Sequence, residues 1–262
     1  MGKKSLSNVY SKSLLYSLET DEFWGVRKES ASALSKLKLK NKDAILISLF
    51  KSELDDRVRS EIVKILKYSK NESTIKFLIE IVLKEQNEYI VRSAVNSLSK
   101  SNKDSLMSLI EFILERESHN DIVIKSAIDK LSEIESDSNY ERLLELSSYG
   151  GTTWSARPNA VRGLEKYIKK HPTILDKMTH FIEDPNYRVR WEALEIICKY
   201  GGKNELEKML KFTNNDPLTK MELSSAKRYI KKRIKKWNIY PGAKKVSKKT
   251  LSEIYGKMET NS

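Results

Sequence analysis

The sequence is poor in several residue types, and each shortage excludes a class of protein. Its one cysteine, Cys198, cannot form an internal disulfide, so we expect a reducing compartment, the cytoplasm being the simplest. Nine glycines and five prolines are few for a turn-rich β-sandwich or a glycine-loop nucleotide enzyme. No stretch approaches the roughly 18 consecutive apolar residues that a transmembrane helix needs. These shortages favour a mostly helical, soluble protein.

Histidine is also scarce. The three histidines, His119, His171 and His180, are far apart in the sequence, and no two of them lie one helical turn apart. A shared metal site on one helix needs such a pair. We therefore predict no metal site and no cofactor.

The sequence instead contains a repeat of about 33 residues. Each copy begins at an apolar or small residue, which we call the anchor, and small or apolar residues follow it at offsets of four, five and eight. The six anchors are Val26, Val58, Ile90, Val123, Ala156 and Val189. A seventh, degenerate copy has Ala226 and Ile230 in the same frame. Offsets of four, five and eight lie on one face of a helix, so each copy predicts an amphipathic helix.

A second amphipathic segment precedes each of these helices, so the repeated unit is predicted to be a helical hairpin. The preceding segments are 9–18, 44–54, 74–83, 105–114, 140–146, 174–182 and 206–212. One hairpin cannot bury its own apolar stripe, and stacking neighbours can. We predict an all-α protein: an α-solenoid, a right-handed superhelix of about seven hairpins, over residues 1–237. Residues 238–262 would be a basic C-terminal tail with a short helix near its end.

Helix-capping residues agree with this division. Asp184-Pro185 places an N-cap residue before a proline, and we expect that proline in the first turn of the helix that contains Val189. Asp216-Pro217 repeats the pattern one copy later. Pro158 is expected in the first turn of its own helix, where a missing N–H is tolerated.

The second helices resemble HEAT repeats, and the resemblance covers about residues 5–236. It rests on Trp24-Gly-Val-Arg-Lys-Glu-Ser-Ala-Ser-Ala-Leu, Asp56-Arg-Val-Arg and Tyr187-Arg-Val-Arg-Trp-Glu-Ala-Leu. More narrowly, Asp21-Glu-Phe-Trp-Gly-Val-Arg with Ala31 and Leu34, and Ser148-Tyr-Gly-Gly, resemble the C-terminal HEAT-like domain of M1-family aminopeptidases. That resemblance implies a catalytic half with His-Glu-x-x-His and Gly-x-Met-Glu-Asn motifs. Neither motif occurs here, so the chain is not expected to be the peptidase itself.

Basic residues recur just after the anchors. Arg27, Arg59, Arg157 and Arg190 lie at offset one, inside the apolar stripe, where a guanidinium needs a partner. One interpretation is a ladder in which these arginines pair with carboxylates or helix-end carbonyls of neighbouring copies. The other is a row of cations on the concave face that binds a partner, with these members: Arg27, Arg59, Arg92, Lys125, Arg157, Arg190 and Trp191. Arg92 and Lys125 are displaced by one position, which interrupts the row.

Aromatic residues at offset minus two also allow two interpretations. Trp24, Trp154 and Tyr187 can fix the start of each second helix to the core, or they can be stacking platforms along one edge. Trp191, Glu192 and Arg190 together resemble the ingredients of a HEAT-like DNA glycosylase, without a matching motif.

Positive charge is concentrated at the C-terminal end. The chain has 49 basic and 36 acidic residues, a net charge of +13, and residues 217–262 contain 13 of the basic and three of the acidic ones. These 46 residues thus account for +10 of the excess. The candidates for polyanion binding are Lys227, Arg228, Lys231, Lys232, Arg233, Lys235, Lys236, Lys244, Lys245, Lys248 and Lys249.

Two functions follow from these patterns. The first is a non-catalytic scaffold or accessory subunit that binds a protein partner on its concave face, conceivably an M1-type aminopeptidase. The second is a nucleic-acid-binding HEAT protein, including a glycosylase, that contacts phosphates through the basic C-terminal region.

Overall fold

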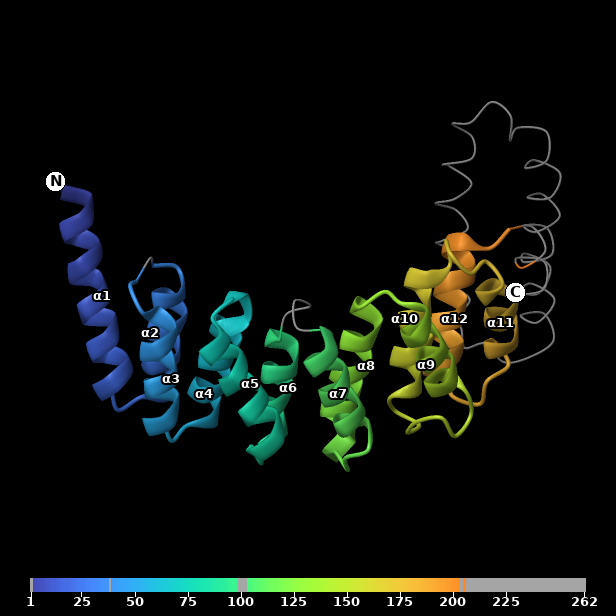
Figure 1. The fold of residues 1–262 in the computed structure, drawn as a ribbon, viewed down its shortest axis with the longest axis horizontal. Coiled ribbons are helices and arrows are strands. Elements are labelled where there is room, and N and C mark those ends of the chain that lie inside the picture. The colour runs from blue at the N-terminus through green and yellow to red at the C-terminus, as the bar shows by residue number, and fades with distance from the viewer. Residues whose placement is uncertain (1, 38, 99–102, 203–204, 206–262) are drawn as a thin grey trace, which may run out of the picture. The chain divides into compact units, whose positions relative to one another are not determined.

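The computed structural model describes residues 2–37, 39–98, 103–202 and 205, and all regular structure in these ranges is helical. The chain forms two compact units that divide after Ile134, which we call unit 1 and unit 2. The α-helices of unit 1 are α1 (Gly2–Thr20), α2 (Trp24–Ser35), α3 (Lys42–Ser52), α4 (Asp56–Ile65), α5 (Glu72–Lys84), α6 (Glu88–Ser97), α7 (Lys103–Leu114) and α8 (Ile122–Glu133). Those of unit 2 in the described ranges are α9 (Asp137–Ser147), α10 (Arg157–Leu164), α11 (Ile174–Phe181) and α12 (Tyr187–Tyr200). Short 3-10 turns lie at Leu66–Tyr68, His119–Asp121 and Glu165–Tyr167. The all-α prediction is confirmed (Figure 1).

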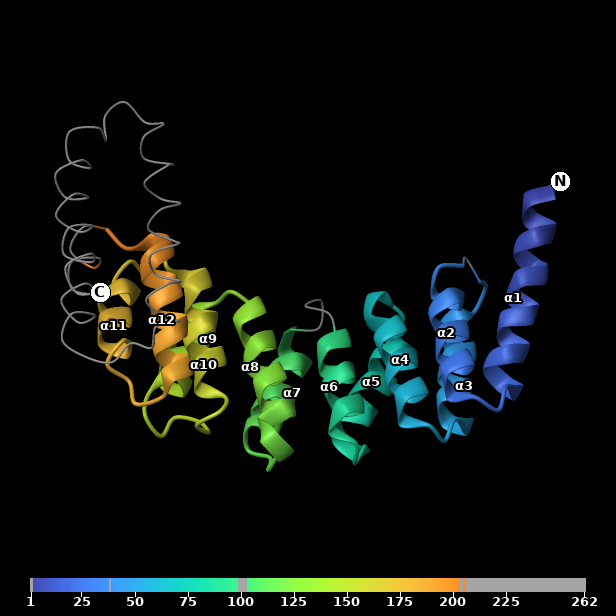
Figure 2. The ribbon, with the colours of Figure 1, turned by 180° about the vertical axis from the view of Figure 1, so that it is seen from behind.

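Helices alternate as the repeat predicts. The six anchors lie in or directly before the even-numbered helices, and the odd-numbered helices match the preceding amphipathic segments. In unit 1 the even-numbered helices pack in series, α2 on α4, α4 on α6 and α6 on α8, which Figure 2 shows from behind. In unit 2, α10 packs against both α9 and α12.

The core lies where the stripe predicts, with one exception. Five of the six anchors are at most 1% exposed, and Val26 is 40% exposed. The difference has a physical reason. Val58, on α4, lies on a helix packed between α2 and α6, whereas α2 has an even-numbered neighbour in unit 1 on one side only.

Two local predictions were wrong by a few residues. Segment 44–54 was expected to be helical to its end, but α3 stops at Ser52 and Leu54 lies in the following turn. Asp184 was expected to cap α12, but the N-cap is Asn186, whose side chain accepts a hydrogen bond from the Arg188 N–H. Asp184 instead accepts from the Asn186 N–H, so proline lies in the turn rather than in the helix.

The turn between α9 and α10 depends on two glycines. Gly150 has a φ of 82°, in the left-handed region that favours glycine. A Cβ on Gly151 would collide with the Glu145 carbonyl oxygen, so the chain can turn this closely only without a side chain there. None of the helices in the described ranges is long and apolar enough to cross a membrane.

Candidate functional site

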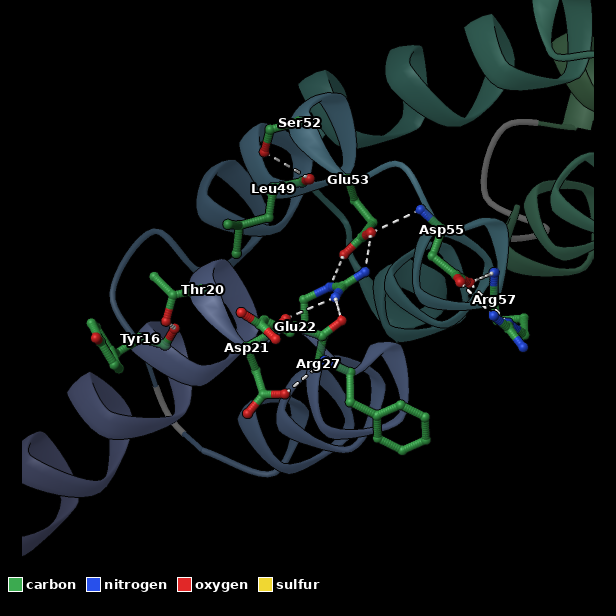
Figure 3. A network of polar contacts seen from close by, with 11 residues as sticks. Tyr16, Thr20, Asp21, Glu22, Arg27, Leu49, Ser52, Glu53, Asp55 and Arg57 are labelled. Atoms are coloured by element: carbon green, nitrogen blue, oxygen red, sulfur yellow. Dashed lines mark hydrogen bonds and ion pairs between the residues drawn. The ribbon is translucent and has the colours of Figure 1, made fainter.

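The arginine after the first anchor is held inside unit 1 by its own contacts. The Arg27 Nε and Nη2 groups donate to the two carboxylate oxygens of Glu53 at 2.8 and 2.9 Å. Its Nη1 group donates to the carbonyl oxygens of Asp21 and Glu22 at 2.8 and 3.0 Å. Figure 3 shows the guanidinium enclosed between Glu53 and these carbonyls. Four of the five N–H donors are therefore used, and the group joins the first hairpin to the second.

The same contact recurs in two later copies. Arg59 pairs with Glu85, 26 residues on, and its Nη1 donates to Asp56 at 2.8 Å. Arg157 pairs with Asp184, 27 residues on, and is only 2% exposed. Each arginine therefore reaches from its even-numbered helix to the turn of the next hairpin, as the ladder interpretation expects. Arg157, buried in this contact, presents no surface to a partner.

Arg190 makes the same backbone contacts as Arg27. Its Nη1 donates to the carbonyl oxygens of Asp184 and Pro185 at 2.9 and 3.2 Å, as Arg27 does six and five residues before itself. The displaced cations behave differently. Arg92 lies over the Tyr89 ring at 5.3 Å, and Lys125 donates to the Asn120 carbonyl oxygen at 2.8 Å. Within unit 1, Arg92 and Lys125 therefore make contacts of a different kind from those of Arg27 and Arg59.

In the two middle copies an aliphatic side chain takes the arginine position. Val91 and Ile124 lie one residue after their anchors and are at most 4% exposed. Here the polar link between hairpins runs from Glu88, whose carboxylate accepts from the Ser118 hydroxyl at 3.0 Å and the His119 N–H at 2.7 Å. The offset-one position is therefore an inside position in the copies with an aliphatic residue.

The carboxylates that receive these arginines also organise the hairpin turns. Glu53, Glu85 and Asp184 each accept the backbone N–H two residues later, which places that residue as the N-cap of the next helix. Burial raises the pKa of Glu53, but hydrogen bonds from Arg27 and the Asp55 N–H outweigh it, so the net shift is downward. Sequence spacing from each arginine to an acid 26 or 27 residues later is the signal that would have found these partners.

Exposed apolar side chains gather at the hairpin turns. We define the hairpin-turn edge of each unit as the turns from odd- to even-numbered helices with the first helical turn after them. Seven of the eleven exposed large hydrophobic side chains in the described ranges lie there: Phe23, Val26, Leu54 and Tyr89 in unit 1, and Tyr149, Trp154 and Tyr187 in unit 2.

Arginines lie over several of the aromatic rings. Arg57 lies over Trp24 at 3.6 Å, and Arg188 lies 5.7 Å from the centre of the Tyr187 ring. Trp154 and Tyr187 are half exposed and lie on the hairpin-turn edge of unit 2, so part of each ring is accessible for contact. Trp24 is half-buried beneath Arg57 and beside Phe23.

The glycosylase-like set is only partly assembled. Glu192 forms an ion pair with Arg162 at 3.1 Å rather than with Arg190, and Trp191 beside it is half-buried. Burial raises the pKa of Glu192, and the charge of Arg162 offsets this only in part. Cys198 is a free, buried thiol. Among the described side chains no group of three metal-binding residues comes together.

A groove of about 460 Å³ lies beside the Arg27 network in unit 1. The end of α1, the start of α2 and the end of α3 form its walls, and Arg27 and Glu53 line one side. No feature of the sequence predicted this groove, because its residues come from separate hairpins. The polyanion-binding candidates, Lys227 to Lys249, and the tail lie outside the described residues.

No protein-family model matches this chain, and a search of the curated proteins finds no match either.

Proposed function

We propose that this protein is a non-catalytic HEAT-repeat scaffold, an α-solenoid of about seven hairpins, that binds a protein partner. Polar contacts at repeat spacing support the stacked arrangement. Ser60 and Ser93 share a hydrogen bond across 33 residues, and Ser97 donates to the Val63 carbonyl oxygen across 34. Each such contact joins one even-numbered helix to the next, as stacked repeats require.

The hairpin-turn edge is the observation that carries the protein-binding function. Tryptophan, tyrosine and arginine are the residues most enriched at the centres of protein interfaces, and exposed clusters of them mark interaction sites. Trp154, Tyr187 and Arg188 in unit 2 fit that composition. The arginines of the alternative concave-face row are held in intramolecular contacts. We therefore propose that the partner binds the hairpin-turn edge.

Affinity capture with the intact chain tests this function. The variant Trp154→Ala/Tyr187→Ala removes two half-exposed rings, and we expect it to lose a partner that the wild type retains. The matched control is Leu83→Ala/Phe112→Ala, which removes two similarly exposed apolar side chains from the odd-numbered helices α5 and α7. The captured protein, once purified, should bind the wild type at least about tenfold more tightly than the edge variant. Equal capture by the edge and control variants would contradict the proposal.

The short motif over residues 21–34 supports an M1-type aminopeptidase catalytic chain as that partner. The motif contains Arg27, whose contacts join the first hairpin to the second, so the resemblance includes residues that hold these hairpins together. A purified M1 catalytic chain that lacks its own C-terminal repeats is the reagent for this test. Formation of a complex that the edge variant disrupts is the expected result.

The charge of residues 217–262 favours a second candidate, binding of nucleic acid. An affinity that falls steeply with salt is the property of such contacts. Deletion of residues 238–262 together with neutralisation of Lys231, Lys232, Lys235 and Lys236 should abolish binding to DNA or RNA. Absence of binding by the intact chain near about 50 mM salt would exclude this candidate.

A further inference from the structure

The groove in unit 1 has a mixed polar and apolar lining with two accessible leucines. Leu49 of α3 is half-buried, and Leu54 at the rim is 95% exposed. Leu18 and Ile62 lie behind this surface and are 3% and 0% exposed, so they contribute packing rather than contact area. An apolar side chain that entered the groove would contact Leu49 and Leu54 beside polar groups, and binding pockets commonly combine apolar surface with a few polar groups.

The turn that contains Leu54 has a fixed backbone but does not require leucine at this position. It lies between Glu53 and Asp55, and the Asp55 N–H donates to the Glu53 carboxylate at 2.8 Å. The equivalent residues in two other turns of this kind are Gln86 and Pro185. The turn therefore tolerates polar or cyclic residues at this position, and the exposed leucine has no role in the fold that the contacts explain.

The groove lining carries an excess of negative charge, with Glu19, Asp21 and Glu53 against Arg27. The charge of Arg27 is paired with Glu53. Asp21 accepts the Phe23 N–H with one carboxylate oxygen at 2.9 Å, and within the described residues neither Asp21 nor Glu19 forms an ion pair. Two acidic side chains thus border the surface of Leu49 and Leu54, so a complementary ligand carries a positive charge next to an apolar group.

We propose that this groove binds a peptide segment of the partner protein in which an apolar side chain is flanked by lysine or arginine. The apolar side chain lies between Leu49 and Leu54, and the basic side chains face Glu19 and Asp21. The inference rests on the proposed function, because it assigns a chemical class to one contact of the scaffold with its partner.

A short fluorescein-labelled peptide of alternating lysine and leucine is the probe, and fluorescence anisotropy with the intact chain is the measurement. We expect saturable binding with a Kd of about 10 to 100 μM that weakens with salt. Two peptides of the same length serve as controls, one alternating glutamate with leucine and one alternating lysine with serine. Both should bind at least about tenfold more weakly, because each lacks one of the two complementary features.

The variant Leu54→Gln separates binding from folding. It installs the residue that the equivalent turn already has at Gln86, and a side chain 95% exposed contributes little to stability. We expect an unchanged melting temperature and an affinity for the peptide about fivefold weaker.

The variant Asp21→Asn tests the charge. It retains the oxygen that accepts the Phe23 N–H and removes the charge, so it should weaken binding about threefold and reduce its salt dependence. Leu83→Gln, on α5, is the matched control and should change nothing.

Binding of the glutamate peptide as tight as the lysine peptide would overturn the proposal. So would equal affinities of wild type, Leu54→Gln and Asp21→Asn. Partner capture distinguishes this failure from failure of the scaffold function. If capture depends on Trp154 and Tyr187 while the peptide does not bind, the groove proposal alone fails. If the peptide binds as expected while no partner is captured, the scaffold function alone fails.

Discussion

The repeat copies fall into two kinds that differ in the residue directly after the anchor. In copies one, two and five the residue after the anchor is an arginine whose charge is paired with a carboxylate in the next hairpin turn. In copies three and four the same position holds Val91 or Ile124, and both are buried. The comparison teaches that this position faces the interior, and that the fold accepts either an aliphatic side chain or an arginine with a partner.

The two solutions differ in what they demand of the rest of the chain. An aliphatic side chain needs only apolar surroundings, whereas a buried guanidinium needs a matched acid, and loss of either partner leaves a charge uncompensated. Arg157 with Asp184 is the most buried of these pairs, and Arg59 with Glu85 is more exposed. The expected effect of breaking a pair follows the same order.

The largest effect is expected for Arg157→Leu. The change leaves the buried carboxylate of Asp184 without its cation, so the free energy of unfolding should fall by about 3 to 5 kcal/mol. Urea unfolding followed by circular dichroism measures it. The double variant Arg157→Leu/Asp184→Asn should recover most of the loss, because Asn keeps an acceptor for the Asn186 N–H and removes the charge. A double variant no more stable than the single one would show that the pair acts through packing.

Val91→Arg tests the comparison from the other side. The arginine would enter a position that is 0% exposed. The acid 26 residues later, Glu117, is exposed here, whereas Glu53 and Glu85 lie against their arginines, so we expect a loss of about 3 kcal/mol. The same unfolding measurement applies, with Val91→Ile as the control for size. A loss below about 1 kcal/mol would mean that the position opens to solvent and that the inside assignment is wrong for this copy.

The order of the helices could be predicted from sequence because apolar periodicity records burial directly. Five of six anchors are buried, and the odd-numbered helices match their segments within a few residues. The exposure of Val26 could not be predicted, since it depends on which helices flank α2. Leu54 misled the prediction because its helical spacing continued past the residue at which the turn begins.

The candidate site was harder to predict than the fold. The role of the arginines was left open because a sequence shows the cation but not which acid lies beside it. The groove was missed because Leu18, Leu49 and Ile62 come from three different helices and no sequence motif links them. Trp154 and Tyr187 kept two interpretations because the sequence does not distinguish a buried aromatic residue from an exposed one at a helix start.

A smaller effect is expected for Arg59→Leu. Its side chain is 21% exposed and its partner Glu85 13% exposed, so water can solvate the carboxylate left behind. Arg59 also lies over the Phe50 ring at 4.5 Å, and a leucine preserves part of that apolar contact. We expect a loss of about 1 to 2 kcal/mol in the same unfolding assay. A loss equal to that of Arg157→Leu would contradict the proposed link between the burial of an ion pair and the stability lost when it is broken.

The smallest effect concerns Asp55, which caps α4 beside the Arg27 and Glu53 pair. Hydrogen bonds from the Arg57 side chain lower the pKa of Asp55 to about 2. Since the folded-state pKa lies below the unfolded value of about 3.8, the contribution of Asp55 to stability is present above about pH 4 and is lost as the pH falls toward 2.

An NMR titration of the Asp55 carboxyl carbon in the wild type should show a midpoint near 2, and in Arg57→Gln the midpoint should rise toward the unfolded value. Acid unfolding of that variant should begin at a higher pH, while Lys64→Gln, which removes an exposed cation from the other end of the same helix, should leave the Asp55 midpoint unchanged. If Arg57→Gln also leaves the midpoint unchanged, the helix N-terminus rather than the arginine sets the charge of this cap.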